Sequence, residues 1–446
     1  MRFVRLLALT VLAAAAACQG ARDVTARFFA QETARERYVA RLELAGLTGT
    51  AVARDWMSAV DRALREAPRI TPPHEEQGYL APTEPVALAY RVVARRGQEV
   101  SFEIQLYGDT TSQLFIEAWE MELDSARTMR RLEAADSGQR MLVFTPRRDG
   151  EITVVAQAEL LRGGRFTARV RVAPTLAFPV ERHGDADIGS EFGASREGGR
   201  RSHHGIDIFA KRGTPVLAAS PGLVNRVDTT AVGGMVVWMR DDRGNRLYYA
   251  HLDRHYVTEG VRVAAGDTVG FVGNTGNART TPPHLHFGVY RRGEGPVDPY
   301  WFVHRPRGVL ARLVADTSLL GEWVRTPSDG IVVRAAPEQK AGAVGTLARH
   351  DAFRVVAAVG DWYRVRLPDG LMGYVTARFT ESATQAFRVA TVAQSSPMLA
   401  RPFDAHHTAN VMAHVAAGDS VAVLGQFGSY LLVRANGGRE GWLGQE

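Results

Sequence analysis

The sequence has 446 residues, of which 45% are hydrophobic and 23% charged, and it contains a single Cys. An ordinary apolar content excludes a disordered or collagen-like chain, and one cysteine excludes a fold held by intrachain disulfides. The formal net charge is +6, from 54 Lys and Arg against 48 Asp and Glu. Only two of the cations are Lys, and the Arg residues are scattered among acids, which does not suggest a nucleic-acid-binding stripe. We therefore expect several compact domains and no nucleic-acid partner.

The N-terminus has the pattern of an export signal. Arg2 and Arg5 precede an uncharged apolar run, residues 6–17, which ends at Cys18. Twelve residues are too few to span a bilayer, so the pattern predicts a cleaved signal peptide over residues 1–17. The three alanines before the cysteine resemble a bacterial lipobox, which implies a lipid on Cys18 and a membrane-anchored lipoprotein in the periplasm or cell envelope. Ordinary cleavage at an Ala-x-Ala site is the alternative.

Residues 18–78 are expected to form a helical N-terminal segment. Apolar side chains recur every fourth residue at Val52, Trp56, Val60 and Leu64. This spacing places them on one face of a helix.

Residues 79–176 are expected to form a β-sandwich. Apolar and polar residues alternate with a period of two, as in residues 102–107 and 166–172, and turn residues such as 146–150 separate these runs. Alternation of this kind is typical of strands with one buried face. The segment lacks a concentration of catalytic residue types, so we interpret it as a spacer or binding module.

The C-terminus contains an internal repeat with an offset of 68 residues. In each copy a strand, a tight turn and a Gly-aromatic return strand follow one another, as in residues 362–374 and 430–442. The repeat predicts two short β-modules, residues 318–382 and 386–446. They resemble a tandem pair of bacterial SH3-type domains, which implies small β-barrels that bind cell-wall peptide.

The region expected to carry chemistry is residues 177–305. Six of the 13 His residues lie within an 84-residue stretch of it, at positions 203, 204, 251, 255, 284 and 286. In a strand, His284 and His286 would point to the same side, because side chains alternate between faces. Two adjacent imidazoles can reach one metal ion and its bound water.

His203 and Asp207 are four residues apart. In a straight strand they would stand about 13 Å from each other, too far to share a metal ion. We therefore expect the backbone to bend at Gly205, with a strand restarting at residue 206. A helix would also bring the two side chains together, but β-branched residues around a glycine argue against a helix.

Together these patterns indicate a metal site with protonatable neighbours. His203, Asp207 and His286 make a three-ligand set with a fourth position open to water, as catalytic zinc requires. His251 and His284 are left for proton transfer and for stabilising a developing oxyanion. The remaining two of these six histidines, at positions 204 and 255, are interpreted as bystanders.

The same residues carry a family resemblance. In order and spacing, the chain is similar to the lysostaphin and LytM-like zinc metallopeptidases of bacterial cell walls at His203-x-x-x-Asp207, Tyr249-x-His251-Leu252 and His284-Leu285-His286-Phe287-Gly288. The resemblance implies an antiparallel β-sheet domain with one Zn²⁺ held by His203, Asp207 and His286. It implies that His251 and His284 orient the water and stabilise the transition state. It further implies a peptidoglycan substrate, crosslinked stem peptides, whose peptide bonds are hydrolysed.

The expected protein is thus mostly β and multidomain, with a zinc metalloendopeptidase domain between a β-sandwich and two SH3-like barrels. The stretch 277–283 and Gly288 depart from the usual family pattern, so which peptidoglycan bond is cut stays open. One alternative is a non-catalytic cell-wall-binding lipoprotein that regulates other wall hydrolases. Another is the two-His, one-carboxylate site of non-haem Fe(II) oxygenases, although those sites typically begin with a His and a carboxylate two residues apart.

Overall fold

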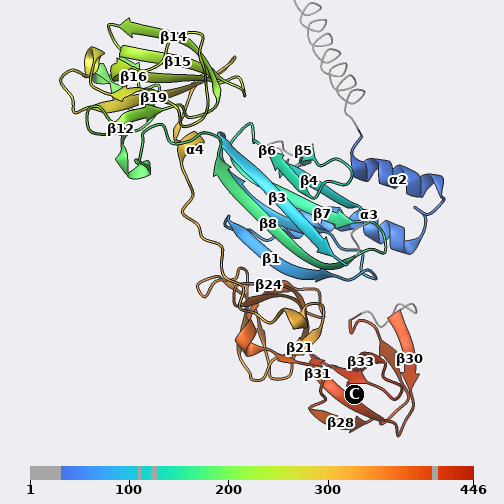
Figure 1. Ribbon diagram of the computed structural model, residues 1–446. Helices are drawn as coiled ribbons and strands as arrows, with labels where there is room; N and C mark the ends of the chain where they lie inside the picture. The colour runs from blue at the N-terminus through green and yellow to red at the C-terminus, as the bar shows by residue number, and fades with distance from the viewer. Residues whose placement is uncertain (1–31, 109–111, 122–127, 404–409, 446) are drawn as a thin grey trace, which may run out of the picture.

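The computed structural model describes residues 32–108, 112–121, 128–403 and 410–445. Cys18 and the expected signal peptide lie outside the described residues. Figure 1 shows an N-terminal unit at the centre, a second unit in green and yellow on one side of it, and two small units in orange and red on the other. Among the described residues, no helix is both long and apolar enough to cross a membrane.

Two helices open the described chain, α2 (Ala34–Leu44) and α3 (Ala51–Glu66). Thr50 caps α3 by accepting a hydrogen bond from the backbone N–H of Ala53, which satisfies one of the free donors at the helix start. The buried residues of α3 include Trp56, Val60 and Leu64, which confirms the predicted helical face. The indole N–H of Trp56 donates to the carbonyl oxygen of Ala158 at 2.8 Å, which ties the helix to the following domain.

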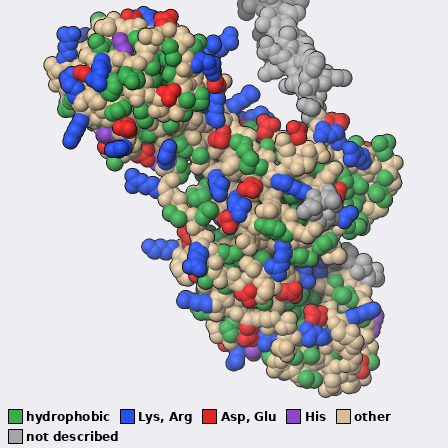
Figure 2. Space-filling model, viewed as in Figure 1, with side chains coloured by type: hydrophobic (Ala, Val, Ile, Leu, Met, Phe, Trp, Pro, Cys, Tyr) green, Lys and Arg blue, Asp and Glu red, His purple; other side chains and the backbone are tan. Residues whose placement is uncertain are grey.

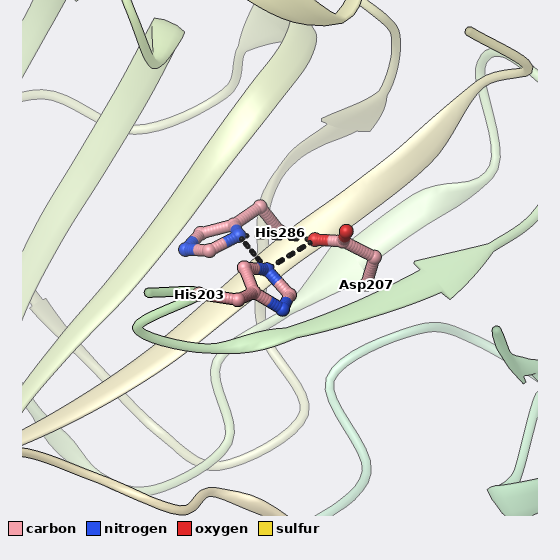
Figure 3. Close-up of side chains that lie close together, drawn as sticks. All are labelled: His203, Asp207 and His286. Atoms are coloured by element: carbon pink, nitrogen blue, oxygen red, sulfur yellow. Dashed lines mark hydrogen bonds and ion pairs between the residues drawn. The ribbon is translucent and has the colours of Figure 1, made fainter. Parts of the chain in front are cut away.

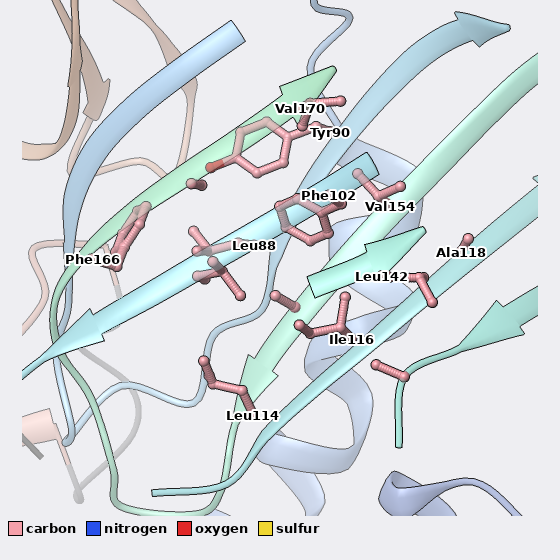
Figure 4. Packing of buried hydrophobic residues seen from close by; sticks show 14 of the residues in the cluster. Leu88, Tyr90, Phe102, Leu114, Ile116, Ala118, Leu142, Val154, Phe166 and Val170 are labelled. Atoms are coloured by element: carbon pink, nitrogen blue, oxygen red, sulfur yellow. The ribbon is translucent and has the colours of Figure 1, made fainter. Parts of the chain in front are cut away.

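The N-terminal unit is completed by a sandwich of two antiparallel sheets, with strand orders β1-β8-β3-β6 and β2-β7-β4-β5. The strands are β1 (His74–Leu80), β2 (Leu88–Ala94), β3 (Gln98–Tyr107), β4 (Leu114–Met121), β5 (Met129–Ala134), β6 (Met141–Phe144), β7 (Gly150–Ala158) and β8 (Gly164–Pro174). Figure 4 shows the core between the sheets, where Tyr90, Phe102 and Phe166 are fully buried. The predicted sandwich is confirmed.

The second unit is built on an antiparallel sheet with the order β17-β14-β15-β16-β19-β12-β9. Its strands are β9 (Ile188–Ser190), β10 (Ser195–Arg196), β11 (Arg201–Ser202), β12 (Ile206–Phe209), β13 (Pro215–Leu217), β14 (Gly222–Thr230), β15 (Gly234–Asp241), β16 (Arg246–His255), β17 (Arg262–Val263), β18 (Thr268–Val272), β19 (His284–Arg291) and β20 (Gly295–Val297). A short helix, α4 (Tyr300–Val303), follows. One face of the sheet forms a core, where Met239, Tyr249 and Phe287 are fully buried.

Two small β-modules follow an extended connection. The first contains β21 (Trp323–Arg325), β22 (Ile331–Arg334), β23 (Ala343–Leu347), β24 (Ala352–Val359), β25 (Trp362–Arg366), β26 (Met372–Thr376) and β27 (Glu381–Ser382). The second contains β28 (Arg388–Thr391), β29 (Ser396–Leu399), β30 (Val411–Val415), β31 (Ser420–Phe427), β32 (Tyr430–Arg434) and β33 (Glu440–Gly444). Strands that begin at 343, 352, 362 and 372 recur at 411, 420, 430 and 440, so the 68-residue repeat is also structural.

The sequence did not predict that the sandwich and the first small module share a sheet. Strand β1 pairs with β8 on one side and with β24 on the other, where Gln77 lies opposite Ala358 and Gly78 opposite Ala357. Figure 1 shows the two strands at this junction. Strand β1 begins at His74, inside the segment expected to be helical. The sequence did not reveal this strand, because half of its inward-facing side chains are polar and obscure the alternation of apolar and polar residues.

A buried ion pair explains those polar side chains. Glu76 of β1 is fully buried, lies 3.3 Å from Nη1 of Arg364 in β25, and accepts a hydrogen bond from the Tyr90 hydroxyl at 2.8 Å. Burial alone would raise the pKa of Glu76, but Arg364 and the hydrogen bonds hold the pKa below its usual range. The carboxylate is therefore charged and links the two units.

We expect Glu76→Ala to destabilise the protein by about 3–5 kcal/mol, because it leaves Arg364 buried without its partner. Glu75→Ala is the matched control on the opposite face of β1. Its partly exposed pair with Arg169 contributes less than about 1 kcal/mol. Urea denaturation followed by tryptophan fluorescence checks both variants. Equal denaturation midpoints for the two variants would contradict the expected contribution of the buried pair to stability.

Candidate functional site

The candidate site lies where β12 and β19 pair, on the face of the sheet opposite the core of the second unit. In β19, Leu285 and Phe287 are fully buried in the core, so His284 and His286 stand on the opposite face. Asp207 lies directly opposite His286 in the register of the two strands. Strand pairing thus brings together groups that are 79 residues apart in the sequence.

His203 reaches the site because the chain leaves the strand pattern between β11 and β12. Gly205 sits in this bend, and its importance is steric. A Cβ atom at this position would lie 2.5 Å from the carbonyl oxygen of Phe287 and 2.8 Å from Nε2 of His286. Any larger residue would therefore push the bend away from β19.

Three side-chain atoms converge at this point (Figure 3). Nε2 of His203 lies 3.0 Å from Oδ1 of Asp207 and 2.9 Å from Nδ1 of His286, and the latter two atoms are 3.0 Å apart. Among the described residues, this is the group whose ligand atoms could hold a metal ion together. Because metal–ligand bonds are about 2.0–2.1 Å, the ligands of a tetrahedral zinc ion lie about 3.3 Å apart, so the nitrogen and oxygen donors fit zinc in kind and in spacing.

The remaining polar atoms of these ligands are also held. Nδ1 of His203 lies 2.8 Å from the carbonyl oxygen of Glu191, so the proton belongs on Nδ1 and the lone pair of Nε2 faces the site. Arg196 donates to Oδ2 of Asp207 at 2.7 Å and also to the Ser190 hydroxyl, which leaves Oδ1 for the site. Sequence reasoning missed Arg196, because no spacing rule connects it to Asp207.

Asp207 is an anion in this environment. Its burial would raise the pKa, but the imidazoles of His203 and His286, each 3.0 Å from Oδ1, outweigh burial and hold the pKa of Asp207 far below its ordinary value. A charged carboxylate is the form that binds a metal cation.

His251 lies beside the three converging residues in a strained conformation. Its φ is +62°, in the left-handed region that non-glycine residues rarely adopt. Its backbone N–H donates to the carbonyl oxygen of Gly233. Nδ1 lies 2.9 Å from the carbonyl oxygen of Thr275, so Nε2 is left as a proton acceptor. Burial, with His284 and His286 as neighbours, lowers the pKa of His251 to about 4, so the ring is neutral near pH 7.

His284 completes the cluster. Its ring centre is 5.1 Å from that of His251, and its Nδ1 lies 2.9 Å from the carbonyl oxygen of Pro282. Nε2 lies 4.0 Å from Oδ1 of Asp207, so it faces the convergence point. All five residues singled out by the sequence are therefore brought together. His204 is exposed and His255 pairs with Gly270 at the far end of β16, so neither belongs to the cluster.

We expect Gly205→Ala to weaken Zn²⁺ binding at least about tenfold, because the new methyl group displaces the His286 ring. Gly184→Ala is a matched control, since a Cβ there meets nothing within 4 Å. Competition with a chromophoric chelator measures the affinity. Equal affinities for the two variants would contradict the steric role of Gly205.

Comparisons with known proteins agree with this geometry. Residues 201–299, which include all five clustered residues, match Peptidase family M23, and residues 329–381 match the bacterial SH3 domain. The L-Ala--D-Glu endopeptidase of Bacillus subtilis is 37% identical over 135 residues, which make up 28% of this chain and 41% of that protein. The DD-carboxypeptidase/endopeptidase Mpg of Neisseria meningitidis is 40% identical over 99 residues, 22% of each chain.

A third relative is the glycyl-glycine endopeptidase ALE-1 of Staphylococcus capitis, 40% identical over 88 residues, which cover 19% of this chain and 24% of that protein. The chain thus spans less than half the length of each of these relatives. Their names refer to different peptide bonds. The chain therefore contains a domain of Peptidase family M23, followed by a bacterial SH3 domain.

Proposed function

We propose that this protein is a zinc metalloendopeptidase that hydrolyses peptide bonds in crosslinked peptidoglycan. The observation that carries the proposal is the convergence of His203, Asp207 and His286 within 3.0 Å of one another, with His251 and His284 beside them. The named activities of the relatives, all peptidases, support the same reaction class.

The residues present fit a zinc ion, because two imidazole nitrogens and one carboxylate oxygen leave a fourth position free. When bound, zinc lowers the pKa of a coordinated water and polarises the scissile carbonyl. Asp207 contributes the anionic donor, and the hydrogen bond from Arg196 holds its carboxylate in one orientation. The backbone carbonyl at Nδ1 of His203 fixes the tautomer that offers Nε2 to the metal.

His251 and His284 would carry out the proton transfers of the reaction. In each ring a backbone carbonyl accepts from Nδ1, so the neutral ring presents Nε2 to the site as a base. One ring can take a proton from the attacking water and the other, once protonated, can stabilise the oxyanion or deliver a proton to the leaving amine. The left-handed backbone at His251 fits such a role, since strain of this kind is concentrated at functional sites.

The other units would bring the enzyme to its insoluble substrate. SH3-type modules are proposed to hold wall peptide, and a lipid on Cys18 is proposed to anchor the protein to a membrane of the cell envelope. Because β1 and β24 pair, the sandwich and the first SH3 module would act as one unit in this role.

Digestion of purified sacculi tests the proposed reaction. We expect the wild-type protein with Zn²⁺ to release muropeptides and convert crosslinked dimers to monomers, as measured by mass spectrometry. His286→Ala should lose both metal and activity, whereas His251→Ala should keep one zinc ion and lose activity by at least about 100-fold. His204→Ala, an exposed control, should retain activity.

Two results would overturn the proposal. If crosslinked dimers persist with the zinc-loaded wild type, the protein is better explained as a wall-binding regulator. Iron as the metal found in protein purified without added metal, together with oxygen uptake, would instead indicate an oxygenase.

The anchor has its own test. We expect the protein to fractionate with membranes and to incorporate a labelled fatty acid when expressed with its signal peptide. Cys18→Ser should abolish the label and release the protein, because no other cysteine is present. Membrane association and labelling that persist in Cys18→Ser would contradict the lipid anchor.

A further inference from the structure

The sheet face that carries the proposed metal ligands continues beyond them. Along β19 the next two side chains on the side of His286 are Gly288 and Tyr290, and along β16 the residues opposite them are Tyr248 and Arg246. Gly288 contributes no side chain, and the ring of Tyr290 and the backbone of His204 pack over it. The face then continues onto β15, where Trp238 lies opposite Tyr248.

Three aromatic rings form a connected row on this face. The ring of Tyr248 meets that of His286 edge-on, with centres 5.8 Å apart. Trp238 lies 4.3 Å from Tyr248 and 5.1 Å from Tyr290, centre to centre. Each of the three is only partly buried, whereas residues of the opposite face, such as Tyr249, are fully buried. The row thus offers apolar ring surface next to the metal site.

Two arginines end the row. Arg240 of β15 and Arg246 of β16 lie directly opposite each other, and both are exposed. Like charges in this position repel each other and destabilise a sheet. Among the described residues, no carboxylate forms an ion pair with either guanidinium. Arg246 instead lies over the Trp238 ring at 4.8 Å, which orients its planar group beside the aromatic row.

We propose that Trp238, Tyr248, Tyr290, Arg240 and Arg246 form a substrate subsite that binds a carboxylate-bearing residue of the peptide. An anion between the two guanidiniums would relieve their repulsion and accept charge-assisted hydrogen bonds from both. The aromatic row would contact the intervening peptide chain. This inference rests on the proposed peptidase function and narrows its substrates to acidic peptides, as distinct from uncharged oligoglycine.

The sheet sets the distance between the subsite and the reacting bond. Side chains on one face of a strand are about 7 Å apart, so Gly288 and Tyr290 stand about 7 and 13 Å along β19 from His286. An extended peptide advances about 3.3 Å per residue. The carboxylate should therefore lie two to four residues from the scissile bond.

Binding to metal-free protein tests the subsite without hydrolysis. The probes are two synthetic stem peptides that are identical except that the α-carboxylate of D-Glu is free in one and amidated in the other, with pentaglycine as a third. We expect calorimetry to show the free acid binding about tenfold more tightly than the amide, and pentaglycine most weakly. The double variant Arg240→Gln/Arg246→Gln should abolish the preference for the acid, while Trp238→Leu should weaken both stem peptides equally.

Arg262→Gln is the matched control, because it removes one exposed cation of the same domain that is already paired with Asp242. It should keep the tenfold preference. The inference is overturned if the wild type binds acid and amide equally, or if the double arginine variant keeps the preference. Digestion of sacculi separates this failure from that of the proposed function. A wild type that cleaves sacculi without preferring the acid refutes the subsite alone, and one that prefers the acid without cleaving refutes the peptidase.

Discussion

The pairing of β12 with β19 is the constraint on which the functional site depends. It sets Asp207 opposite His286, and the buried alternate residues of β19 fix which face both side chains occupy. A slip of one residue would turn His286 into the core. Gly205 then allows the preceding bend to approach the strand closely enough for His203 to join them.

Around this pairing, main-chain carbonyls hold the imidazoles in defined orientations. His203, His251 and His284 each have Nδ1 within 2.9 Å of a backbone oxygen, so each presents Nε2. These contacts come from loops as well as strands, and at His251 they coexist with an unfavourable left-handed backbone. The fold therefore holds these imidazoles in a preorganised arrangement, and strained residues such as His251 are concentrated at functional sites.

The sandwich joins its two neighbouring units in different ways. The sandwich and first SH3 module share a continuous sheet and a buried ion pair between Glu76 and Arg364, a junction that resists separation. The M23 domain instead meets the sandwich through partly exposed ion pairs such as Arg96 with Glu294 and through the packing of Phe302 against Gly97. Exposed pairs contribute little to stability, so this junction is the weaker of the two.

The sequence by itself determined the helical face of α3, the alternation of the sandwich strands, the 68-residue repeat and two short motifs, His203 with Asp207 and His284 with His286. Each is a periodicity or spacing within a short segment, and such patterns follow from backbone geometry alone. Only the tertiary structure decided that Arg196 supports Asp207, that β1 joins a second domain, and that two arginines oppose each other beyond the metal ligands. Those relations depend on register and contacts between segments distant in the chain, which no local period encodes.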